Sequence, residues 1–382
     1  MKTLILWLDA FRPDYISKEN TPFLFDLKQR YGLTELKPSF GFSQASWFTG
    51  CYPNRHGEFF VYNNGEIKVN SWYLRLVPKL LRSHLFNLTR YLKGNDLIAP
   101  LMDIKEISNF SITREKNYHH PHKLKTLFDY FRENNLSYLM YYWPLIIENN
   151  KTRLTLFTKG NDKSKLQKSI NLIRKTNHDV YFFHIAELDA VGHKFGPKSQ
   201  QINAKLREHD ILIEKLVREF NLEKDNVLIW SDHGMIEIKG TINLEEVLPK
   251  DDRYKKLIES TMVKFWFYDK DIKKEILQKL KKVKNGHILS DSEKKKLKID
   301  FDTNENYEEV FLANPGYLIC PNIWQKQPIK GMHGFDYSQK GELGVLMGNK
   351  KFNKKGNMVD MLPTILKLLK LKPREIDGKS LI

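Results

Sequence analysis

The sequence predicts an α/β protein with a mostly parallel β-sheet and helices on both of its faces. Short apolar runs that are typical of buried strands alternate along the chain with amphipathic segments that are typical of helices. Carboxylate and imidazole side chains follow several of these runs, as they do at the carboxyl edge of an open α/β sheet. With 382 residues, of which 41% are hydrophobic, the chain is long enough for one large domain with insertions or for two domains.

The predicted strands and helices follow one another in the order that a parallel sheet requires. Apolar runs predict strands at residues 3–8, 138–143, 180–185 and 227–230. Amphipathic periodicity predicts helices at residues 21–31, 43–49, 124–135, 202–220 and 361–369. Because parallel strands need crossover connections, helices between these strands would cover both faces of the sheet.

A basic and aromatic stretch at about residues 60–120 interrupts the alternation. We interpret it as an insertion into the core, with an inserted helical pair as the favoured structure. A substrate lid and an amphipathic segment that lies on a membrane surface are the alternatives, because basic residues there alternate with large apolar ones. The stretch therefore suits a nucleotide base or a lipid head group about equally well.

A second interruption, at residues 240–330, predicts a small inserted α+β cap. It contains a strand-like run at 263–268, a helical segment and a further short strand at 310–312. Ten lysines between positions 272 and 298 make it the most basic part of the chain. We therefore divide the chain into a core, formed by residues 1–239 and 331–382, and this cap.

The charge of the chain favours anionic partners. A net charge of +17 attracts phosphates, nucleic acids or acidic lipid head groups, although a solvated lysine-rich surface explains the same count. No nucleic-acid-binding motif accompanies the lysines, so we do not expect specific nucleic-acid binding. Two cysteines, Cys51 and Cys320, indicate a reducing compartment. No apolar run approaches the length of a membrane span, and we expect a cytoplasmic protein that touches a membrane at most peripherally.

Six carboxylate and imidazole side chains recur in four separate places and could together hold metal ions. They are Asp9, Asp189, His193, Asp232, His233 and His333. Three carboxylates and three imidazoles suit a pair of zinc-like ions better than magnesium alone. Because Asp232 and His233 are adjacent, we expect their side chains to diverge and to serve two different metals. Such a pair of ions can stabilise both the attacking and the leaving oxygen of a displacement at phosphorus.

The motifs around these residues resemble the alkaline phosphatase superfamily and, within it, the type I phosphodiesterase/nucleotide pyrophosphatase branch. Residues 8–15 are similar to the D-G-x-R-x-D-Y opening, with Ala10 where glycine is usual. The other similar motifs are T-G-x-Y-P-x-x-H-G at 49–57, D-x-x-G-H-x-x-G-P at 189–197, S-D-H-G-M at 231–235 and G-x-H-G-F at 331–335. Segments 314–317, 360–364 and 377–381 also look like the family, so the resemblance spans nearly the whole chain.

The resemblance implies a three-layer alkaline-phosphatase-like sandwich that hydrolyses phosphodiester or pyrophosphate bonds with two divalent metal ions. One metal would be held by Asp189, His193 and His333, and the other by Asp9, Asp232 and His233. Zinc is the favoured metal, and manganese or iron would suit the same ligands. The implied substrate is a small phosphodiester such as a nucleotide or a lipid head group.

The nucleophile is where the chain departs from the family pattern. Phe40 stands nine residues before Thr49, where family members carry Thr or Ser. A three-residue deletion would preserve the helical face, so Ser43 is our first choice for the nucleophile, with a contact to one metal. Ser43 could instead be only a helix N-cap. Ser39 is the second choice and Ser46 the third. The expected reaction passes through a phosphoserine intermediate with retention at phosphorus.

Several other functions compete with this one. A sulfatase would need a C/S-x-P-x-R segment, which residues 43–47 lack, and the motif at 49–57 fits a phosphoglycerate mutase less well. A phosphomonoesterase or a phospho-head-group transferase of the same superfamily is the main alternative, because the cap rather than the metals selects the substrate. An inactive basic lipid- or nucleic-acid-binding protein on this scaffold is the alternative outside enzymes, and retention of all six ligands argues against it.

Overall fold

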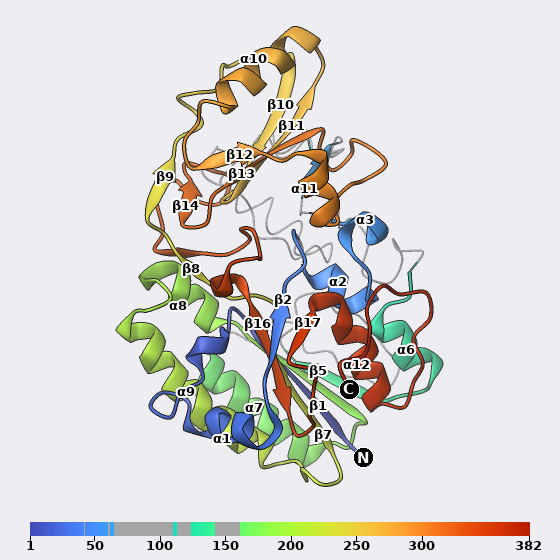
Figure 1. Cartoon of the computed structure of the whole chain (residues 1–382). Coiled ribbons are helices and arrows are strands. Elements are labelled where there is room, and N and C mark those ends of the chain that lie inside the picture. The colour runs from blue at the N-terminus through green and yellow to red at the C-terminus, as the bar shows by residue number, and fades with distance from the viewer. Residues whose placement is uncertain (42, 60–61, 65–109, 113–123, 142–160) are drawn as a thin grey trace, which may run out of the picture. The chain divides into compact units, whose positions relative to one another are not determined.

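A computed structural model provides the structure of the chain, which divides into two compact units (Figure 1). The structure describes residues 1–41, 43–59, 62–64, 110–112, 124–141 and 161–382. Unit 1 comprises Met1–His56, Tyr118–Ile238 and Ile329–Ile382, and unit 2 comprises Gly57–Asn117 and Lys239–Pro328. Most of the insertion predicted at about residues 60–120 lies outside the described residues, and so do the helical pair, lid or membrane segment proposed for it.

Unit 1 contains a seven-stranded sheet in which one strand runs against the others. The strands, in order across the sheet, are β17 (Lys355–Asn357), β2 (Thr34–Lys37), β16 (Gly344–Gly348), β7 (Asn226–Trp230), β1 (Thr3–Leu8), β6 (Val180–Ile185) and β5 (Tyr138–Tyr141). β7, β1, β6 and β5 pair in parallel, and β17 pairs in parallel with β2. β16 is antiparallel to both of its neighbours, so β2 and β7 run in the same direction.

Helices cover both faces of this sheet, and each face has its own hydrophobic core. Alternation along β1 directs Leu4 and Leu6 into one core and Ile5 and Trp7 into the other. The first core is closed by α1 (Pro22–Tyr31), α7 (Asp162–Lys175), α8 (Glu187–Phe195) and α9 (Gln200–Val217). The second is closed by α2 (Ser43–Thr49), α6 (Leu127–Glu133) and α12 (Met361–Leu368). The predicted three-layer sandwich with a mostly parallel sheet is therefore confirmed.

The helices begin where capping side chains satisfy the first backbone N–H groups. Ser199 accepts a hydrogen bond from Ile202 N, which starts α9 two residues before the predicted position. Thr126 and Asp129 form a capping box, so α6 begins at Leu127 and not at residue 124. Within the described part of the chain, none of the helices combines the length and the apolar character that a membrane crossing needs.

Several elements of unit 1 were not predicted, and β16 illustrates why. Its apolar run is only three residues long between Gly344 and Gly348. Both glycines lie against the backbone of β7: an added Cβ would be 2.2 Å from Ser231 O at Gly344 and 1.9 Å from Val227 O at Gly348. The remaining short elements of unit 1 are the 3₁₀ helices Pro13–Tyr15, Lys340–Glu342 and Met358–Asp360, α3 (Pro53–His56), β8 (Ile236–Glu237) and β15 (Gly331–Met332).

Unit 2 is an α+β structure around a four-stranded antiparallel sheet, as predicted for the cap. The sheet order is β10 (Tyr254–Ile258), β11 (Met262–Phe267), β13 (Glu309–Ala313) and β12 (Gly286–Ile288). The predicted strands at 263–268 and 310–312 correspond to β11 and β13. The other elements described in unit 2 are α10 (Lys270–Leu280), α11 (Asp291–Lys296), β9 (Gly240–Ile242), β14 (Tyr317–Ile319), β3 (Tyr62–Asn64) and β4 (Phe110–Ile112).

Candidate metal centre

The six candidate ligands come from the carboxyl edge of three adjacent strands and from one loop. Asp9 directly follows β1, which lies between β6 and β7 in the sheet. Asp232 lies two residues after β7, and Asp189 lies in the first turn of α8, which follows β6. His193 is one helical turn further along α8. His333 directly follows β15. The parallel direction of the three strands therefore brings distant parts of the chain to one edge.

The turn after Asp9 depends on a strained residue. Ala10 has a φ of 57°, which lies in the left-handed region that disfavours residues with a Cβ. Glycine is usual at this place in the family that the motif resembles. At this position the chain therefore has a backbone conformation that favours glycine, although the residue is alanine.

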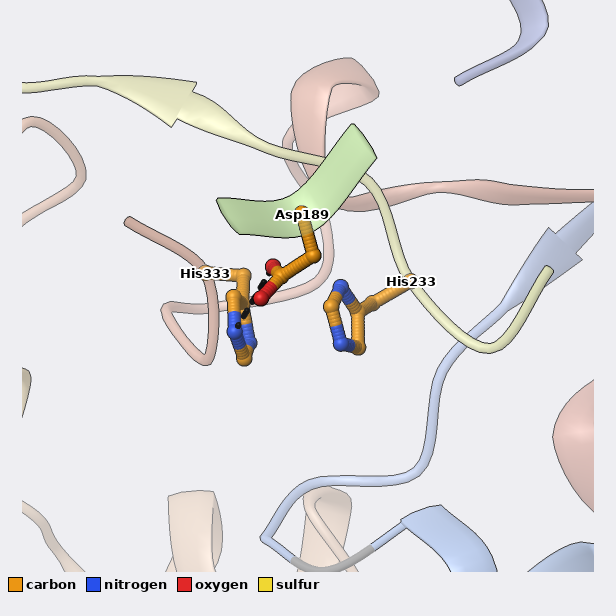
Figure 2. A group of neighbouring side chains, drawn as sticks. All are labelled: Asp189, His233 and His333. Atoms are coloured by element: carbon orange, nitrogen blue, oxygen red, sulfur yellow. Dashed lines mark ion pairs between the residues drawn. The ribbon is translucent and has the colours of Figure 1, made fainter. Parts of the chain in front are cut away.

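Two groups of ligand atoms lie close enough to share an ion, and His233 belongs to both. Ligand atoms of Asp9, Asp232 and His233 all lie within 4.8 Å of one another, and so do those of Asp189, His233 and His333 (Figure 2). His233 Nε2 is 3.4 Å from Asp9 Oδ1 and 3.4 Å from Asp232 Oδ2. Asp189 Oδ1 is 3.6 Å from His333 Nε2.

The expectation that Asp232 and His233 diverge is wrong. Their side chains approach each other because His233 Nδ1 lies 2.9 Å from Gly234 O, a contact that turns the ring back toward both aspartates. The set of Asp189, His193 and His333 stays a prediction, while the group that meets the distance criterion around Asp189 and His333 contains His233. His193 still lies beside it, with its Nε2 3.3 Å from Asp189 Oδ1.

Backbone carbonyls fix the orientation of two of the imidazoles. His233 Nδ1 lies 2.9 Å from Gly234 O, and His193 Nδ1 lies 2.8 Å from Gly331 O. A carbonyl oxygen only accepts hydrogen bonds, so each Nδ1 carries a proton and donates it. In a neutral ring this leaves the lone pair on Nε2, the atom that faces the carboxylates. Metal-binding histidines are oriented in this way.

The charges of the cluster are unbalanced. Burial raises the pKa of Asp9 well above its ordinary value, and the nearby carboxylates of Asp232 and Asp189 raise it further. Burial alone would lower the pKa of His233, but Asp232 and Asp9 outweigh it and raise the pKa to about 9. For Asp189, burial is opposed by the adjacent His193, and its pKa falls below the usual range. The centre thus favours positive charge between its carboxylates.

Two buried carboxylate oxygens in the cluster accept no well-aligned hydrogen bond from the described residues. They are Asp189 Oδ1 and Asp232 Oδ1, although His193 Nε2 lies 3.3 Å from Asp189 Oδ1. An unsatisfied buried acceptor costs about 1–3 kcal/mol, and more when it is charged. A cation would satisfy both oxygens and offset the charge. The donor set of carboxylate oxygen and imidazole nitrogen suits zinc, manganese or iron, so these residues fit the two divalent ions that the sequence implied.

Glu342 supports the loop that carries His333, and no motif in the sequence could have identified it. Its carboxylate accepts hydrogen bonds from Gly334 N at 3.0 Å and from Phe335 N at 3.2 Å. Burial raises the pKa of Glu342 to about 7, although these two donors oppose the shift. Its main-chain oxygen also accepts a hydrogen bond from Gly234 N at 2.8 Å. Glu342 therefore connects the loops that carry His333 and His233.

A third group, formed by Asp162, Glu187 and His209, meets the same 4.8 Å distance criterion. Its charges are already balanced. Asp162 Oδ2 accepts a hydrogen bond from Glu187 N at 2.7 Å and lies 3.3 Å from His209 Nε2. Lys165 pairs with Asp162 at 3.4 Å, and Lys205 pairs with Glu187 at 2.9 Å. This group caps and anchors the start of α8, the helix that carries Asp189 and His193.

The candidate serines surround the start of α2, after the carboxyl end of β2. Ser43 is the first residue of α2, not its N-cap, and its hydroxyl donates a hydrogen bond to Ser39 O at 3.1 Å. Ser46 is fully buried and its hydroxyl lies 3.0 Å from His56 Nε2. Phe40, which occupies the position of the usual nucleophile, is buried beside the ring of Tyr337. Because β2 runs parallel to β7 and β1, these serines follow the same edge of the sheet as the ligands.

Comparison with known proteins agrees with this architecture. Two structures of murine ectonucleotide pyrophosphatase/phosphodiesterase 5 superpose with a TM-score of 0.73 at 17% identity, over 99% of this chain and 98% or 97% of those chains. One of them is an inactive variant in complex with AMP. A pyrophosphatase/phosphodiesterase of Schizosaccharomyces pombe is 26% identical over 277 residues, which are 65% of this chain and 49% of that protein. The chain thus spans about half the length of that relative.

A shorter similarity is to a transferase. GPI ethanolamine phosphate transferase 2 of Yarrowia lipolytica is 43% identical over 68 residues, which are 18% of this chain and 8% of that protein. The family model described as type I phosphodiesterase/nucleotide pyrophosphatase matches residues 3–336, a range that includes all six candidate ligands. The chain therefore belongs to the type I phosphodiesterase/nucleotide pyrophosphatase family.

Proposed function

We propose that the protein is a metal-dependent hydrolase of phosphodiester or pyrophosphate bonds. The observation that carries this proposal is the pair of overlapping carboxylate and imidazole groups at the carboxyl edge of the sheet. Among the described residues, buried oxygens of Asp189 and Asp232 accept no well-aligned hydrogen bond. Asp9, Asp232 and His233 would hold one ion, and Asp189, His193 and His333 the other. Two such ions supply charge stabilisation for the phosphoryl oxygens and a lower pKa for an attacking hydroxyl. Zinc is the favoured ion, with manganese and iron as alternatives.

Ser43 is the nucleophile in this proposal. Its side chain lies at the first residue of α2, and the other two candidates fit less well. Ser46 is fully buried against His56, and Ser39 is slightly less exposed than Ser43, at 6% compared with 9%. The Ser43 hydroxyl would leave its bond to Ser39 O, attack phosphorus and displace the alcohol or phosphate leaving group. Water would then hydrolyse the phosphoserine, and the two displacements together would retain configuration at phosphorus.

A small nucleotide is the substrate class that we favour. The family description and the AMP complex of the murine relative both support it. Transfer of a phospho-head group is the second candidate, and the local similarity to the GPI ethanolamine phosphate transferase supports that alternative. The two differ in the acceptor for the second step, which is water in a hydrolase and an alcohol in a transferase.

The test is a comparison of two aryl esters with purified protein and added zinc or manganese. We expect bis-p-nitrophenyl phosphate to be cleaved faster than p-nitrophenyl phosphate. Ser43→Ala and Asp232→Ala should each abolish cleavage, whereas Ser46→Ala, the matched serine control, should retain it. Loss of cleavage in Asp232→Ala and Ser39→Ala but not in Ser43→Ala would move the nucleophile to Ser39.

Other outcomes would change the proposed reaction. A protein that binds two metals but cleaves neither ester, yet releases a labelled head group to an added alcohol, would be a transferase. A protein that binds no metal would contradict the enzymatic proposal and leave the inactive binding scaffold.

We also propose a cytoplasmic location, supported by two buried cysteines that form no disulfide. Peripheral membrane contact is a further proposal that rests on the basic charge of the chain. Fractionation of cells that express a tagged protein, before and after a high-salt wash of the membranes, tests both. Recovery from an extracellular or integral-membrane fraction would contradict them.

A further inference from the structure

His184 lies beside the metal centre but belongs to none of the motifs that identify it. It is the fifth residue of β6 and pairs in register with Trp7 of β1. Its ring stacks on the Trp7 ring with the centroids 3.9 Å apart. Trp7 is two residues before Asp9, so the strand pairing that fixes Trp7 also brings His184 to the first metal-site carboxylate.

The two oxygens of Asp9 face different partners. Asp9 Oδ1 lies 3.4 Å from His233 Nε2, on the side shared with Asp232. Asp9 Oδ2 lies 3.2 Å from His184 Nε2, at hydrogen-bond distance. A carboxylate that binds a metal is ionised and only accepts hydrogen bonds, so His184 Nε2 carries the proton in this contact. His184 therefore donates its hydrogen bond to Asp9 Oδ2, the oxygen that would not contact the metal.

We propose that His184 is a positioning residue whose Nε2–H fixes the carboxylate of Asp9 so that Oδ1 faces the metal position shared with Asp232 and His233. The proposal rests on the metal binding proposed above. A carboxylate ligand can rotate about its Cβ–Cγ bond and lose its alignment, and a hydrogen bond to the second oxygen prevents this. Outer partners of this kind typically change metal affinity by about 10- to 100-fold.

A purely structural role for His184 makes a different prediction. If the His184 ring only packs on Trp7, an aromatic side chain without a donor should preserve metal binding and an amide should not. If the Nε2–H donor matters, the amide should preserve metal binding and the aromatic side chain should not. His184→Phe keeps a ring for stacking but removes the Nε2–H. His184→Gln loses the ring but can place an amide N–H near the position of Nε2.

The experiment measures zinc binding to the full-length wild-type protein and to both variants, by competition with a chromophoric chelator and by metal content after dialysis. We expect His184→Phe to lower the affinity of the protein for one of two zinc ions by about 10- to 100-fold, while the affinity for the other ion is unchanged. His184→Gln should restore affinity to within a few fold of wild type. Thermal unfolding of the metal-free proteins shows whether each variant is folded.

The outcomes separate this inference from the proposed function. Two zinc ions of unchanged affinity in His184→Phe would overturn the inference and leave the proposed function intact. Equal weakening in His184→Phe and His184→Gln would also overturn it, since the lost ring and not the lost donor would then be responsible. If wild type binds no zinc, manganese or iron, the inference and the proposed metal centre fail together. Weakening in His184→Phe that His184→Gln reverses is the only result that supports it.

Discussion

Two clusters in unit 1 look alike by distance but differ in how their charges are balanced. The ligand atoms of Asp9, Asp232 and His233 lie within 4.8 Å of one another, and those of Asp162, Glu187 and His209 do too. In the second cluster, lysines and a backbone N–H approach the carboxylates. In the first, a buried oxygen of Asp232 has no hydrogen-bond partner among the described residues.

Spacing alone therefore does not identify a metal site. A carboxylate that already accepts hydrogen bonds from the backbone and from cations gains little from a further cation. A carboxylate that is buried beside other carboxylates gains a great deal, because desolvation and mutual repulsion are both relieved. The unbalanced cluster is therefore suited to bind ions, whereas the balanced one stabilises the helix that carries two of the ligands.

The largest expected effect comes from removing one carboxylate of the unbalanced cluster. Asp232→Asn should lower phosphodiesterase activity by roughly 10³-fold or more, because a ligand and a negative charge are lost at once. It should also reduce the number of bound ions from two to one. Asp162→Asn is the matched control and should still bind two ions. The measurement is the metal content of both variants. If Asp162→Asn lost an ion and Asp232→Asn lost none, the cluster around Asp162 and not the one around Asp232 would be the metal site.

Glu342 provides an intermediate case, since two backbone N–H groups donate to its carboxylate and the positive charge of His233 lies nearby, yet burial dominates. Its folded pKa of about 7 lies above the ordinary value of 4.5, so its contribution to stability is fully present below pH 4.5 and is lost as the pH rises through 7. We expect this loss to reach about 3 kcal/mol in the metal-free protein at pH 8. The check is urea unfolding of wild type and Glu342→Gln at pH 5 and pH 8. A variant that keeps the full pH dependence of wild type would contradict the assignment.

Asp162 should show the opposite dependence on pH. Burial would raise its pKa, but the His209 ring and the N–H of Glu187 outweigh burial and lower the pKa to about 2. Since the folded pKa lies below the ordinary value of 3.8, its contribution to stability is present above about pH 4 and lost as the pH falls through 2. The contribution is about 2 kcal/mol at neutral pH. Asp162→Asn should be less stable than wild type at pH 7, and the difference should shrink by pH 2.5.

The smallest expected effect comes from the rim of the balanced cluster. Lys205 is partly exposed and pairs with Glu187 at 2.9 Å and with Glu208 at 2.6 Å. Pairs of this kind contribute about 0.5 kcal/mol, so Lys205→Met should shift the free energy of unfolding by less than about 1 kcal/mol. Zinc titration of the variant should still give two ions. A third ion would indicate that this lysine is what keeps the balanced cluster free of metal.

The sequence was sufficient to predict the central strands and to select side chains that the fold brings close together, because both signals are local. An apolar run that is followed by an aspartate predicts both a strand and a candidate metal ligand, as at residues 3–9 and 227–232. Amphipathic periodicity predicted α1, α9 and α12 for the same reason. β16 escaped prediction because its apolar run is very short and its partners lie far away in the sequence.

Contacts that depend on strand register and ring orientation could not be predicted. The approach of His184 to Asp9 requires the pairing of β1 with β6, and the only local signal was a histidine in an otherwise apolar strand. The approach of His233 to Asp232 depends on a hydrogen bond to the adjacent carbonyl, which no residue type specifies. The role of Glu342 depends on backbone donors, which every sequence contains.

The hydrogen bonds of the two oriented histidines also have a consequence for synthesis of the chain. His233 is oriented by its neighbour Gly234, and its partners Asp9 and Asp232 are already present once residue 234 has been made. His193 is oriented by Gly331, and His333 completes the second set of ligands about one hundred residues later. If the two sets bind ions as proposed, the ligands of the first set are therefore all synthesised before the last ligand of the second set. The second ion could be held by its full set only after His333 has emerged from the ribosome.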